Sequence, residues 1–383
     1  MLNKTKAKKV LIVTGEASGD LHASHLVKEM LILQPDLYCY GMGGEKLRTE
    51  GTHIVFDIAQ LAVMGITEVI RHFGQIYRVF TTLKGLLKND RPDLVILVDY
   101  PDFNLRLAKV AHKYGVPVLY YISPQIWAWR TNRIKQIAQV VKKMIVVFPF
   151  ERSLYEEAGI DVTFTGHPLL DIVKTTKSKE ENIKHFGLDP HKTTIGLLPG
   201  SRISEVKKLL PPMIGAAHQL AEQFSNLQFI LPVAPGIQRT EIEKLLRDSK
   251  VAISVVDNSI YEVISTAHLV VVASGTATLE TALLSKPMVI IYKMSPLSYM
   301  IGKKLVKVPY IGMANIMAGK KVVPELIQNE ATADNITAKV PHLLTDNHYY
   351  QSVCEDLTSI KQELGKPGAS KRAAQIAVNM LLH

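Results

Sequence analysis

The chain has 383 residues, 47% of them hydrophobic and 21% charged, which predicts a folded protein of two domains and excludes a disordered one. Its two cysteines, Cys39 and Cys354, are far apart, which excludes a disulfide framework or a cysteine-rich zinc site and is typical of a reducing cytosol. The net charge of +10 predicts an anionic partner; because the basic residues are scattered and no nucleic-acid motif occurs, we expect a phosphorylated ligand or an acidic lipid surface rather than nucleic acid.

The first half of the chain alternates short apolar runs with helical patterns, a pattern typical of βαβ units. The runs are nearly continuous, as expected for parallel strands that are covered on both faces. We predict strands at VLIVTG (10–15), YCYGMGG (38–44), DLVILVD (93–99), PVLYYIS (117–123), MIVVF (144–148) and VTFTG (162–166). Helical stretches such as 21–33 and 104–114 separate them. The first run is too short for a signal peptide, and no run reaches the roughly 18 apolar residues that span a bilayer, so we expect a soluble protein.

The loop after the first strand, GEASGD (15–20), brings two carboxylates to a place where a nucleotide phosphate usually binds. Glu16, Ser18 and Asp20 offer hydrogen-bond acceptors there. We therefore expect this loop to bind sugar hydroxyls rather than a phosphate. Asp20 equally suits the cap of a helix that begins at Leu21.

The stretch 61–83 has apolar residues at helical spacing, for which a core-facing helix is the simplest explanation. These residues are Val63, Ile66, Ile70, Phe73, Tyr77, Phe80 and Leu83. Arg71 and Arg78 on the other faces also allow an element that lies on an anionic membrane surface. The sequence leaves both interpretations open.

The segment DYPDFN (99–104) supplies a candidate general base. Asp99 ends a predicted strand just before a Tyr-Pro turn, a position from which a carboxylate can take a proton from a hydroxyl. Asp102 is better explained as the N-cap of the following helix. Asn104 suits that role or a polar contact with an acceptor.

Both tryptophans of the chain, Trp127 and Trp129, lie in the segment 120–137, followed by Arg130 and Arg133. Tryptophans are most often core residues, and arginines at this spacing suit a solvated face. The alternative is a basic cluster that contacts a substrate phosphate.

The strand pattern restarts after a polar stretch at 174–193, which we interpret as the link between two domains. The predicted strands are TIGLLPGS (194–201), LQFILPV (227–233), VAISVVD (251–257), LVVVASG (269–275) and PMVIIY (287–292). The last segment, 350–383, has helical spacing and no strand. We predict two doubly wound α/β domains, 1–170 and 171–349, that face a cleft and line it with the loops after their strands.

The segment VVVASGTATLE (270–280) runs from a strand into a helix. Ser274, Gly275 and Thr276 stand at the helix start, where free N–H groups and the helix dipole suit a diphosphate. Glu280 follows about one turn later, where it would accept hydrogen bonds from ribose hydroxyls. Helix capping is the ordinary alternative.

A second strand end, LLPGSRISEV (197–206), repeats this arrangement with Ser201 and Arg202. A guanidinium can bind a departing diphosphate through two parallel hydrogen bonds, although alone Arg202 would equally be a surface residue. Two such strand ends favour a nucleotide-diphosphate site. No G-x-x-x-x-G-K-[ST] or G-x-G-x-x-G motif opens a helix, and no histidine spacing predicts a metal site.

Nine segments, in this order, carry a resemblance to one known family. They are GEASGD (15–20), LAVMGITEV (61–69), DYPDFN (99–104), SPQIWAWR (123–130), FPFE (148–151), GHPLLD (166–171), LLPGSR (197–202), ASGTATLE (273–280) and ANIMAG (314–319). In these segments the chain resembles the lipid-A-disaccharide synthase family, inverting glycosyltransferases of the GT-B fold. Ala17 and Tyr100 vary mildly from the forms of the motifs that we expect, and they put acceptor geometry rather than activity in question.

The resemblance implies transfer of 2,3-diacylglucosamine from UDP-2,3-diacylglucosamine to the 6-hydroxyl of 2,3-diacylglucosamine 1-phosphate (lipid X). The products are the β-1,6 disaccharide 1-phosphate and UDP, and no metal or other cofactor is required. The family works as a peripheral protein at the cytoplasmic face of the Gram-negative inner membrane, which strengthens the membrane interpretation of 61–83. Residues 350–383 are then a helix that packs back on the first domain or on the partner subunit of a homodimer.

The resemblance also assigns roles to the candidate residues. Asp99 becomes the general base, and Arg202 with residues 274–276 stabilises the departing diphosphate. Asn315 faces the donor, and the loop 15–20 orients a sugar.

Two alternatives stay open at this point. One is another GT-B enzyme that acts on UDP-N-acetylglucosamine, such as an epimerase or a transferase, but we would not expect it to carry both GEASGD and SPQIWAWR. The other is a non-enzymatic protein that binds lipid surfaces, and the retention of Asp99, Arg202 and Glu280 argues against it.

Overall fold

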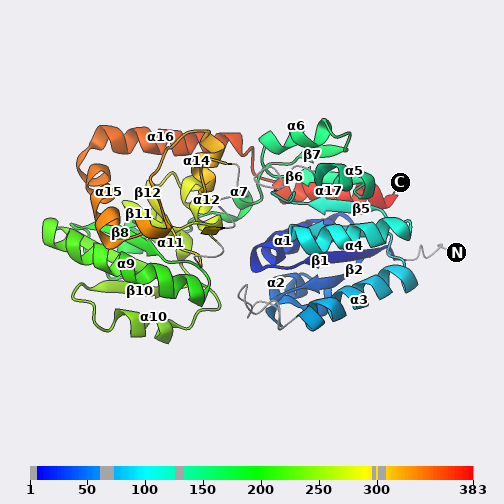
Figure 1. Ribbon diagram of the computed structural model, residues 1–383, viewed down its shortest axis with the longest axis horizontal. Helices are drawn as coiled ribbons and strands as arrows, with labels where there is room; N and C mark the ends of the chain where they lie inside the picture. The colour runs from blue at the N-terminus through cyan, green and yellow to red at the C-terminus, as the bar shows by residue number, and fades with distance from the viewer. Residues whose placement is uncertain (1–6, 61–72, 126–132, 296–298, 301–307, 383) are drawn as a thin grey trace. The chain divides into compact units, whose positions relative to one another are not determined.

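A computed structural model describes residues 7–60, 73–125, 133–295, 299–300 and 308–382 (Figure 1). The chain divides into two compact units, one made of Met1–Asp171 with Leu364–His383 and the other of Ile172–Glu363. Each unit is built on one parallel sheet that helices cover. The expectation of two doubly wound α/β domains is therefore confirmed.

The first unit has a seven-stranded sheet in the order β3-β2-β1-β4-β5-β6-β7. Its strands are β1 Lys9–Thr14, β2 Tyr38–Gly43, β3 His53–Asp57, β4 Leu94–Val98, β5 Val118–Tyr121, β6 Lys143–Val146 and β7 Val162–Phe164. The strand order reverses between β1 and β4, which pair in parallel. In such sheets the ligand site lies beyond the carboxyl ends of the strands at this point.

The two helices predicted at 21–33 and 104–114 are present in the first unit, and each begins a few residues earlier than predicted. The helices of this unit are α1 Ala17–Leu33, α2 Glu45–Thr49, α3 Phe73–Asn89, α4 Pro101–Lys113, α5 Ile134–Val140, α6 Phe150–Glu156, α7 Leu169–Ile172 and α17 Ala369–Leu382, with a short 3₁₀ turn at Ile58–Gln60. Helix α1 starts four residues before Leu21, inside the segment GEASGD (15–20). Strand β3 was not predicted, because HIVFD is only partly buried at the edge of the sheet.

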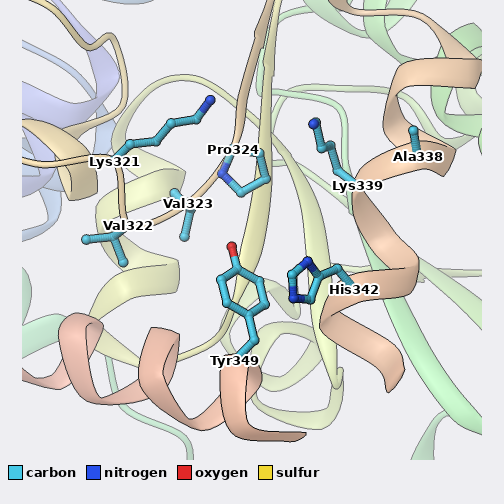
Figure 2. A pocket seen from close by; sticks show the side chains of 8 residues that line it. All are labelled: Lys321, Val322, Val323, Pro324, Ala338, Lys339, His342 and Tyr349. Atoms are coloured by element: carbon cyan, nitrogen blue, oxygen red, sulfur yellow. The ribbon is translucent and has the colours of Figure 1, made fainter. Parts of the chain in front are cut away.

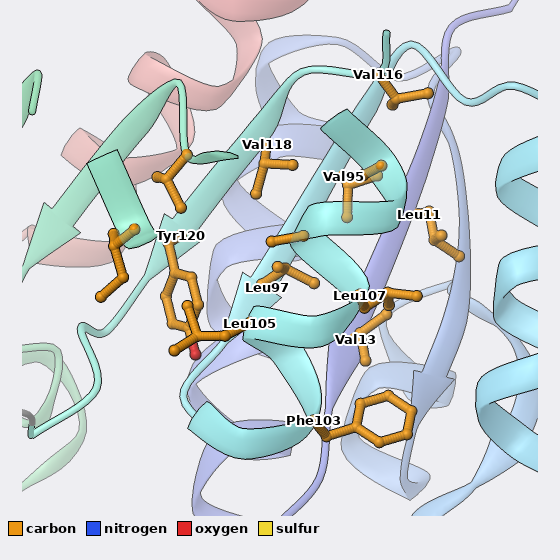
Figure 3. Packing of buried hydrophobic residues seen from close by; sticks show 14 of the residues in the cluster. Leu11, Val13, Val95, Leu97, Phe103, Leu105, Leu107, Val116, Val118 and Tyr120 are labelled. Atoms are coloured by element: carbon orange, nitrogen blue, oxygen red, sulfur yellow. The ribbon is translucent and has the colours of Figure 1, made fainter. Parts of the chain in front are cut away.

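Central strands of this sheet are buried on both faces, which explains their continuous apolar sequence. All five residues of β4 are fully buried. On one face, residues of β1, β4 and β5 pack against α4, as Figure 3 shows. The labelled members are Leu11, Val13, Val95, Leu97, Phe103, Leu105, Leu107, Val116, Val118 and Tyr120.

The segment predicted as one C-terminal helix consists of two helices in different units. Helix α16, Asn347–Glu363, belongs to the second unit, whereas α17 packs on α1 in the first (Figure 1). The Asp171 carboxylate accepts hydrogen bonds from the N–H groups of Gly368 and Ser370 just before and within the start of α17. The Arg372 guanidinium donates to the carbonyl of Thr165. These bonds fasten the end of the chain to the segment that leaves β7.

The second unit has a six-stranded sheet in the order β10-β9-β8-β11-β12-β13. Its strands are β8 Thr193–Leu198, β9 Leu227–Val233, β10 Ile253–Asp257, β11 Leu269–Ala273, β12 Met288–Tyr292 and β13 Glu325–Ile327. Strand β13 has only three residues and was not predicted. The order reverses between β8 and β11, so the loops after these two strands lie next to each other.

The helices of the second unit include one in the stretch interpreted as a link. They are α8 Lys179–His185, α9 Ile203–Gln223, α10 Arg239–Leu246, α11 Ile260–Thr266, α12 Thr276–Leu283, α14 Met313–Ala318, α15 Ala333–Thr345 and α16, with a 3₁₀ turn at Gln328–Glu330. Helix α8 begins with a capping box between Ser178 and Glu181. Within the described residues, no helix is both long and apolar enough to cross a membrane.

Part of the predicted amphipathic stretch 61–83 is visible as the start of α3. Leu83 is buried in the core, and Phe80 packs against that core. Tyr77 is 65% exposed, so its prediction as a core residue is wrong; Arg78 is exposed beside it. Several predicted positions lie outside the described residues: Val63, Ile66, Ile70, Arg71, Trp127, Trp129, Arg130 and the side chain of Phe73.

Candidate active site

The first unit brings two predicted loops together where β1 and β4 end. Thr14 and Val98 are paired at the ends of these strands. The loop that begins with Gly15 therefore lies beside the turn at Asp99 and Tyr100. The approach is close, since a Cβ atom on Gly15 would lie 2.3 Å from Cγ of Tyr100.

The turn after β4 has a strained main chain. Asp99 and Tyr100 have φ angles of +46° and +50°, and Ile122 after the neighbouring β5 has +63°. This left-handed region costs roughly 1–2 kcal/mol for a residue with a side chain, and a β-branched residue there is an outlier. Strain of this kind gathers at functional sites, where surrounding structure maintains it.

The carboxyl group of Asp99 has an unusual acidity. Its pKa is raised from 3.8 to about 6, mainly by burial and also by the nearby charge of Glu16, while a hydrogen bond from the Tyr100 N–H opposes both. At neutral pH the group is mostly ionised yet close to its pKa. Those are the properties of an effective general base.

The remaining acidic residue of GEASGD has a structural role. The Asp20 side chain is buried, and its oxygens accept hydrogen bonds from the N–H groups of Gly44 at 2.6 Å and Lys46 at 3.1 Å. It thus caps the start of α2, so the predictions that it meets sugar hydroxyls or caps α1 are wrong. Glu16 is exposed just before α1, and Ser18 is partly buried in its first turn. These two side chains keep the predicted access to a ligand.

Two other predictions around α4 need correction. Tyr100, not Asp102, precedes the first helical residue, and Asp102 forms an ion pair with Arg133 at 2.5 Å. Arg133 is thereby held at the start of α4, close to the end of β4. Asn104 is fully buried and donates hydrogen bonds to main-chain carbonyls. Its side chain therefore does not contact an acceptor substrate, contrary to the prediction.

In the second unit, the start of α12 has the form expected of an anion site. Gly275 and Thr276 are exposed, and Ser274 is partly buried. Gly275 has a φ of +151° at the N-cap position, a conformation that a glycine adopts readily. The first N–H groups of this eight-residue helix follow directly after β11. A helix start of this kind favours phosphate groups.

The start of α9 differs from the prediction. The Glu205 carboxylate lies over it and accepts hydrogen bonds from the N–H groups of Ser201 at 3.3 Å and Arg202 at 3.4 Å. Gly200, with a φ of +114°, leaves room for this carboxylate. The N–H groups predicted to bind a phosphate are therefore occupied, and the side chain of Arg202, 63% exposed and paired with Glu205 at 3.1 Å, is the group that can reach an anion.

Glu280 lies on α12 and is buried. Its Oε1 accepts a hydrogen bond of 3.0 Å from the hydroxyl of Tyr261, a residue of α11. Burial raises the pKa of Glu280, and the bond from Tyr261 lowers it in part. Tyr261 was not predicted, because nothing in the chain around it distinguishes an orienting hydroxyl from a core tyrosine.

Asn315 does not face a ligand as predicted. It is fully buried, and its amide donates to the carbonyl of Val323 and to the Glu325 carboxylate. Its Oδ1 accepts from the N–H groups of Val322 and Val323. With every donor and acceptor used inside the chain, this side chain shapes the loop before β13.

One hollow of the second unit lies away from these groups. It measures about 240 Å³, and Figure 2 shows its lining side chains. They are Lys321, Val322, Val323, Pro324, Ala338, Lys339, His342 and Tyr349. The hollow adjoins the amino end of β13, whereas the candidate residues follow the carboxyl ends of β8 and β11. We do not include it in the site.

No group of three or more histidine, cysteine, aspartate or glutamate side chains suited to a metal ion occurs within the described residues.

Comparison with known proteins identifies the family. A family model described as lipid-A-disaccharide synthetase matches residues 10–380. The chain belongs to the lipid-A-disaccharide synthase family. Relatives of that name from Geobacter sulfurreducens and Geobacter metallireducens are 47% and 48% identical to it over 380 and 374 residues. The matches cover 99% of both chains in the first case, and 98% of this chain and 97% of the relative in the second. The chain is accordingly a glycosyltransferase that makes the lipid A disaccharide, and the two alternative functions are not favoured.

Solved structures support the fold. UDP-GlcNAc 2-epimerase from Neisseria meningitidis, bound to UDP-GlcNAc, has a TM-score of 0.66 at 16% identity, over 98% of this chain and 99% of that one. CalG4, the calicheamicin glycosyltransferase, has a TM-score of 0.64 at 12% identity over 99% of both. At these identities the likeness concerns architecture, and it assigns the chain to the GT-B class.

Proposed function

We propose that this chain transfers 2,3-diacylglucosamine from UDP-2,3-diacylglucosamine to the 6-hydroxyl of lipid X, with inversion at the anomeric carbon. The observation that carries this proposal is the Asp99 carboxyl at the end of β4, with a pKa of about 6 and Glu16 beside it. A base of that strength, on a domain of this family, suits removal of a proton from a sugar hydroxyl.

In the proposed step, the 6-hydroxyl oxygen of lipid X attacks the anomeric carbon of the donor from the face opposite the diphosphate. Asp99 takes the hydroxyl proton as the new carbon–oxygen bond forms. The bond between the anomeric carbon and the diphosphate oxygen breaks, and its electron pair leaves with UDP. Glu16 and Ser18 orient the sugar hydroxyls that surround this centre.

We assign the donor to the second domain. The start of α12 and the Arg202 guanidinium stabilise the negative charge that develops on the departing diphosphate. Glu280, oriented by Tyr261, accepts hydrogen bonds from the ribose hydroxyls. A UDP complex of MnaA from S. aureus, with a TM-score of 0.65 at 15% identity over 98% of each chain, supports a UDP-sugar donor on this fold.

A mass-spectrometric assay tests the reaction directly. We expect the purified protein to convert UDP-2,3-diacylglucosamine and lipid X into the disaccharide 1-phosphate, and to do so equally with and without EDTA. The matched reaction with UDP-N-acetylglucosamine should give no product. Product from the non-acylated donor alone, or a requirement for an added divalent cation, would contradict the proposal.

We further propose a peripheral location at the cytoplasmic face of the inner membrane, since both substrates carry acyl chains. Exposed Tyr77 and Arg78 on α3 support contact with an anionic lipid surface. In a vesicle sedimentation assay with phosphatidylglycerol, Arg78→Glu should reduce binding several-fold at low salt. Lys113→Glu, at the end of α4, serves as the charge-matched control. Equal binding by both variants would remove α3 from the contact.

A further inference from the structure

The turn that presents Asp99 is fixed through its main-chain carbonyl. Asn104, on α4, places its Nδ2 2.8 Å from the carbonyl oxygen of Asp99 and 3.2 Å from that of Val98. The same nitrogen lies 3.4 Å from the carbonyl oxygen of Val13 in β1. A single buried amide therefore joins the ends of the two strands at the point where the sheet reverses its order.

A second donor reaches the same carbonyl from the neighbouring strand. The hydroxyl of Tyr120, in β5, donates to the carbonyl oxygen of Asp99 at 2.6 Å. Its ring is fully buried beside Leu97 and Leu105, and its hydroxyl points toward the end of α4 at which Phe103 lies (Figure 3). Because the core fixes the ring, the position of the hydroxyl is fixed too. Both lone pairs of the Asp99 carbonyl thus have a donor.

These two bonds hold the turn in a conformation that it would otherwise leave. Asp99 and Tyr100 both have positive φ angles, and this conformation persists only where neighbouring groups maintain it. Gly15 supports it from the other side, because the Tyr100 ring occupies the space that a side chain at position 15 would need. The carboxyl group of Asp99 is thereby kept in place beside Glu16.

We propose that Tyr120 and Asn104 are positioning residues for Asp99, which hold its main chain so that the carboxylate stays at the reacting hydroxyl. This inference rests on the proposed role of Asp99 as general base. Neither side chain touches a substrate in this scheme. Both act through the carbonyl of Asp99, and a merely structural role would not affect the chemical step.

Tyr120→Phe removes one donor and keeps the buried ring. We expect kcat to fall at least tenfold, while KM for the donor changes less than twofold, because misplacement of a catalytic group slows the chemistry and not the binding. Tyr121→Phe is the matched control. Tyr121 is the next residue of β5, is equally buried, and lies on the opposite face of the sheet. Its hydroxyl has no hydrogen-bond partner within the described residues, so Tyr121→Phe should cost little stability and keep kcat within twofold.

The pH profile supplies a second readout. Three ionisable groups face Asp99 or its turn: Glu16 just before α1, Tyr100 in the turn itself, and Tyr120 in β5. The ion pair of Asp102 and Arg133 lies next to the turn. If the turn relaxes in Tyr120→Phe, the carboxyl leaves its buried place and its pKa falls. We then expect the acidic limb of the kcat profile to move to lower pH, with no such movement in Tyr121→Phe.

An Asp99→Asn background separates the two proposals. Tyr120→Phe should add no further loss to the residual turnover of Asp99→Asn, since it acts through the missing carboxylate. A multiplicative loss in the double variant, or a kcat for Tyr120→Phe equal to that of Tyr121→Phe, would overturn the positioning role alone. Full turnover by Asp99→Asn would instead overturn the base assignment.

A second variant covers the case in which Tyr120→Phe does not fold. Asn104→Ser removes the other donor and shortens the side chain. It should show the same pattern, with kcat lowered, KM for the donor unchanged and the acidic limb moved to lower pH. If soluble Asn104→Ser keeps the pH profile and kcat of the unchanged protein, the inference fails.

Discussion

Asp99→Asn should abolish most turnover and leave UDP binding intact. General-base catalysis contributes roughly 10²- to 10⁴-fold to a rate, and we expect a loss in that range because asparagine fills the same space and cannot take the proton. UDP affinity, measured by isothermal titration calorimetry, should change less than twofold. Turnover should be followed by mass spectrometry at saturating donor.

The same substitution should stabilise the protein. The pKa of Asp99 is about 6 in the folded protein, above its ordinary value of 3.8, so ionisation costs free energy that the unfolded chain does not pay. This destabilisation is absent below pH 3.8, grows between the two values and is complete above pH 6. Asp99→Asn should therefore raise the free energy of unfolding by roughly 3 kcal/mol at pH 8 and by less at pH 5, which paired thermal melts can measure.

Asp161→Asn serves as the control for both effects. Its carboxylate is 66% exposed and pairs with Lys143 at the opposite end of the same sheet. It should keep full turnover and shift the melting temperature little at either pH. A loss of UDP binding in Asp99→Asn, or an unchanged turnover, would contradict the role of Asp99 as a base.

Arg202→Ala should weaken UDP binding by roughly 10- to 100-fold, the range expected for a hydrogen-bonded ion pair with a diphosphate. Uridine, which lacks the diphosphate, should bind the variant and the unchanged protein within twofold. Because the Arg202 side chain is largely exposed, the difference should shrink as salt rises. Isothermal titration of both ligands at two salt concentrations measures these effects.

Arg247→Ala, which removes an exposed arginine at the end of α10, controls for the general change in charge. It should leave both affinities unaltered. Arg202→Lys is a second useful comparison, since it keeps the charge and loses the paired donors; we expect partial recovery of UDP affinity. Equal weakening of UDP and uridine by Arg202→Ala would exclude the diphosphate contact.

Sequence patterns predicted the architecture well, because buried parallel strands have a strong signature. Strand β9 has the predicted bounds, and the other predicted strands were found with small differences at their ends. The edge strands β3 and β13 escaped prediction, since one is only partly buried and the other has three residues. Both are edge strands, which pair with a neighbouring strand on one side only. Such strands are less buried, so they do not need a continuous apolar sequence.

Individual polar residues were harder to assign than strands. Asp20 and Asn315 stand in segments that suggest ligand contacts. The structure instead uses Asp20 to satisfy an N–H group 24 residues away, and Asn315 to satisfy N–H and carbonyl groups 7 and 8 residues away. Such partners depend on the folded path of the chain. Glu205, Tyr261 and Tyr120 were overlooked for the same reason. A side chain that orients another group carries no local pattern of its own.

The place of α17 has a consequence for biosynthesis. This helix covers α1 in the first domain, but it follows the whole second domain in the chain. A ribosome therefore makes the first sheet, then every strand of the second, before the helix that packs on α1 emerges. Until then the surface of α1 that α17 covers stays open to solvent or to chaperones. The amino-terminal domain is begun first and is the last to be completed.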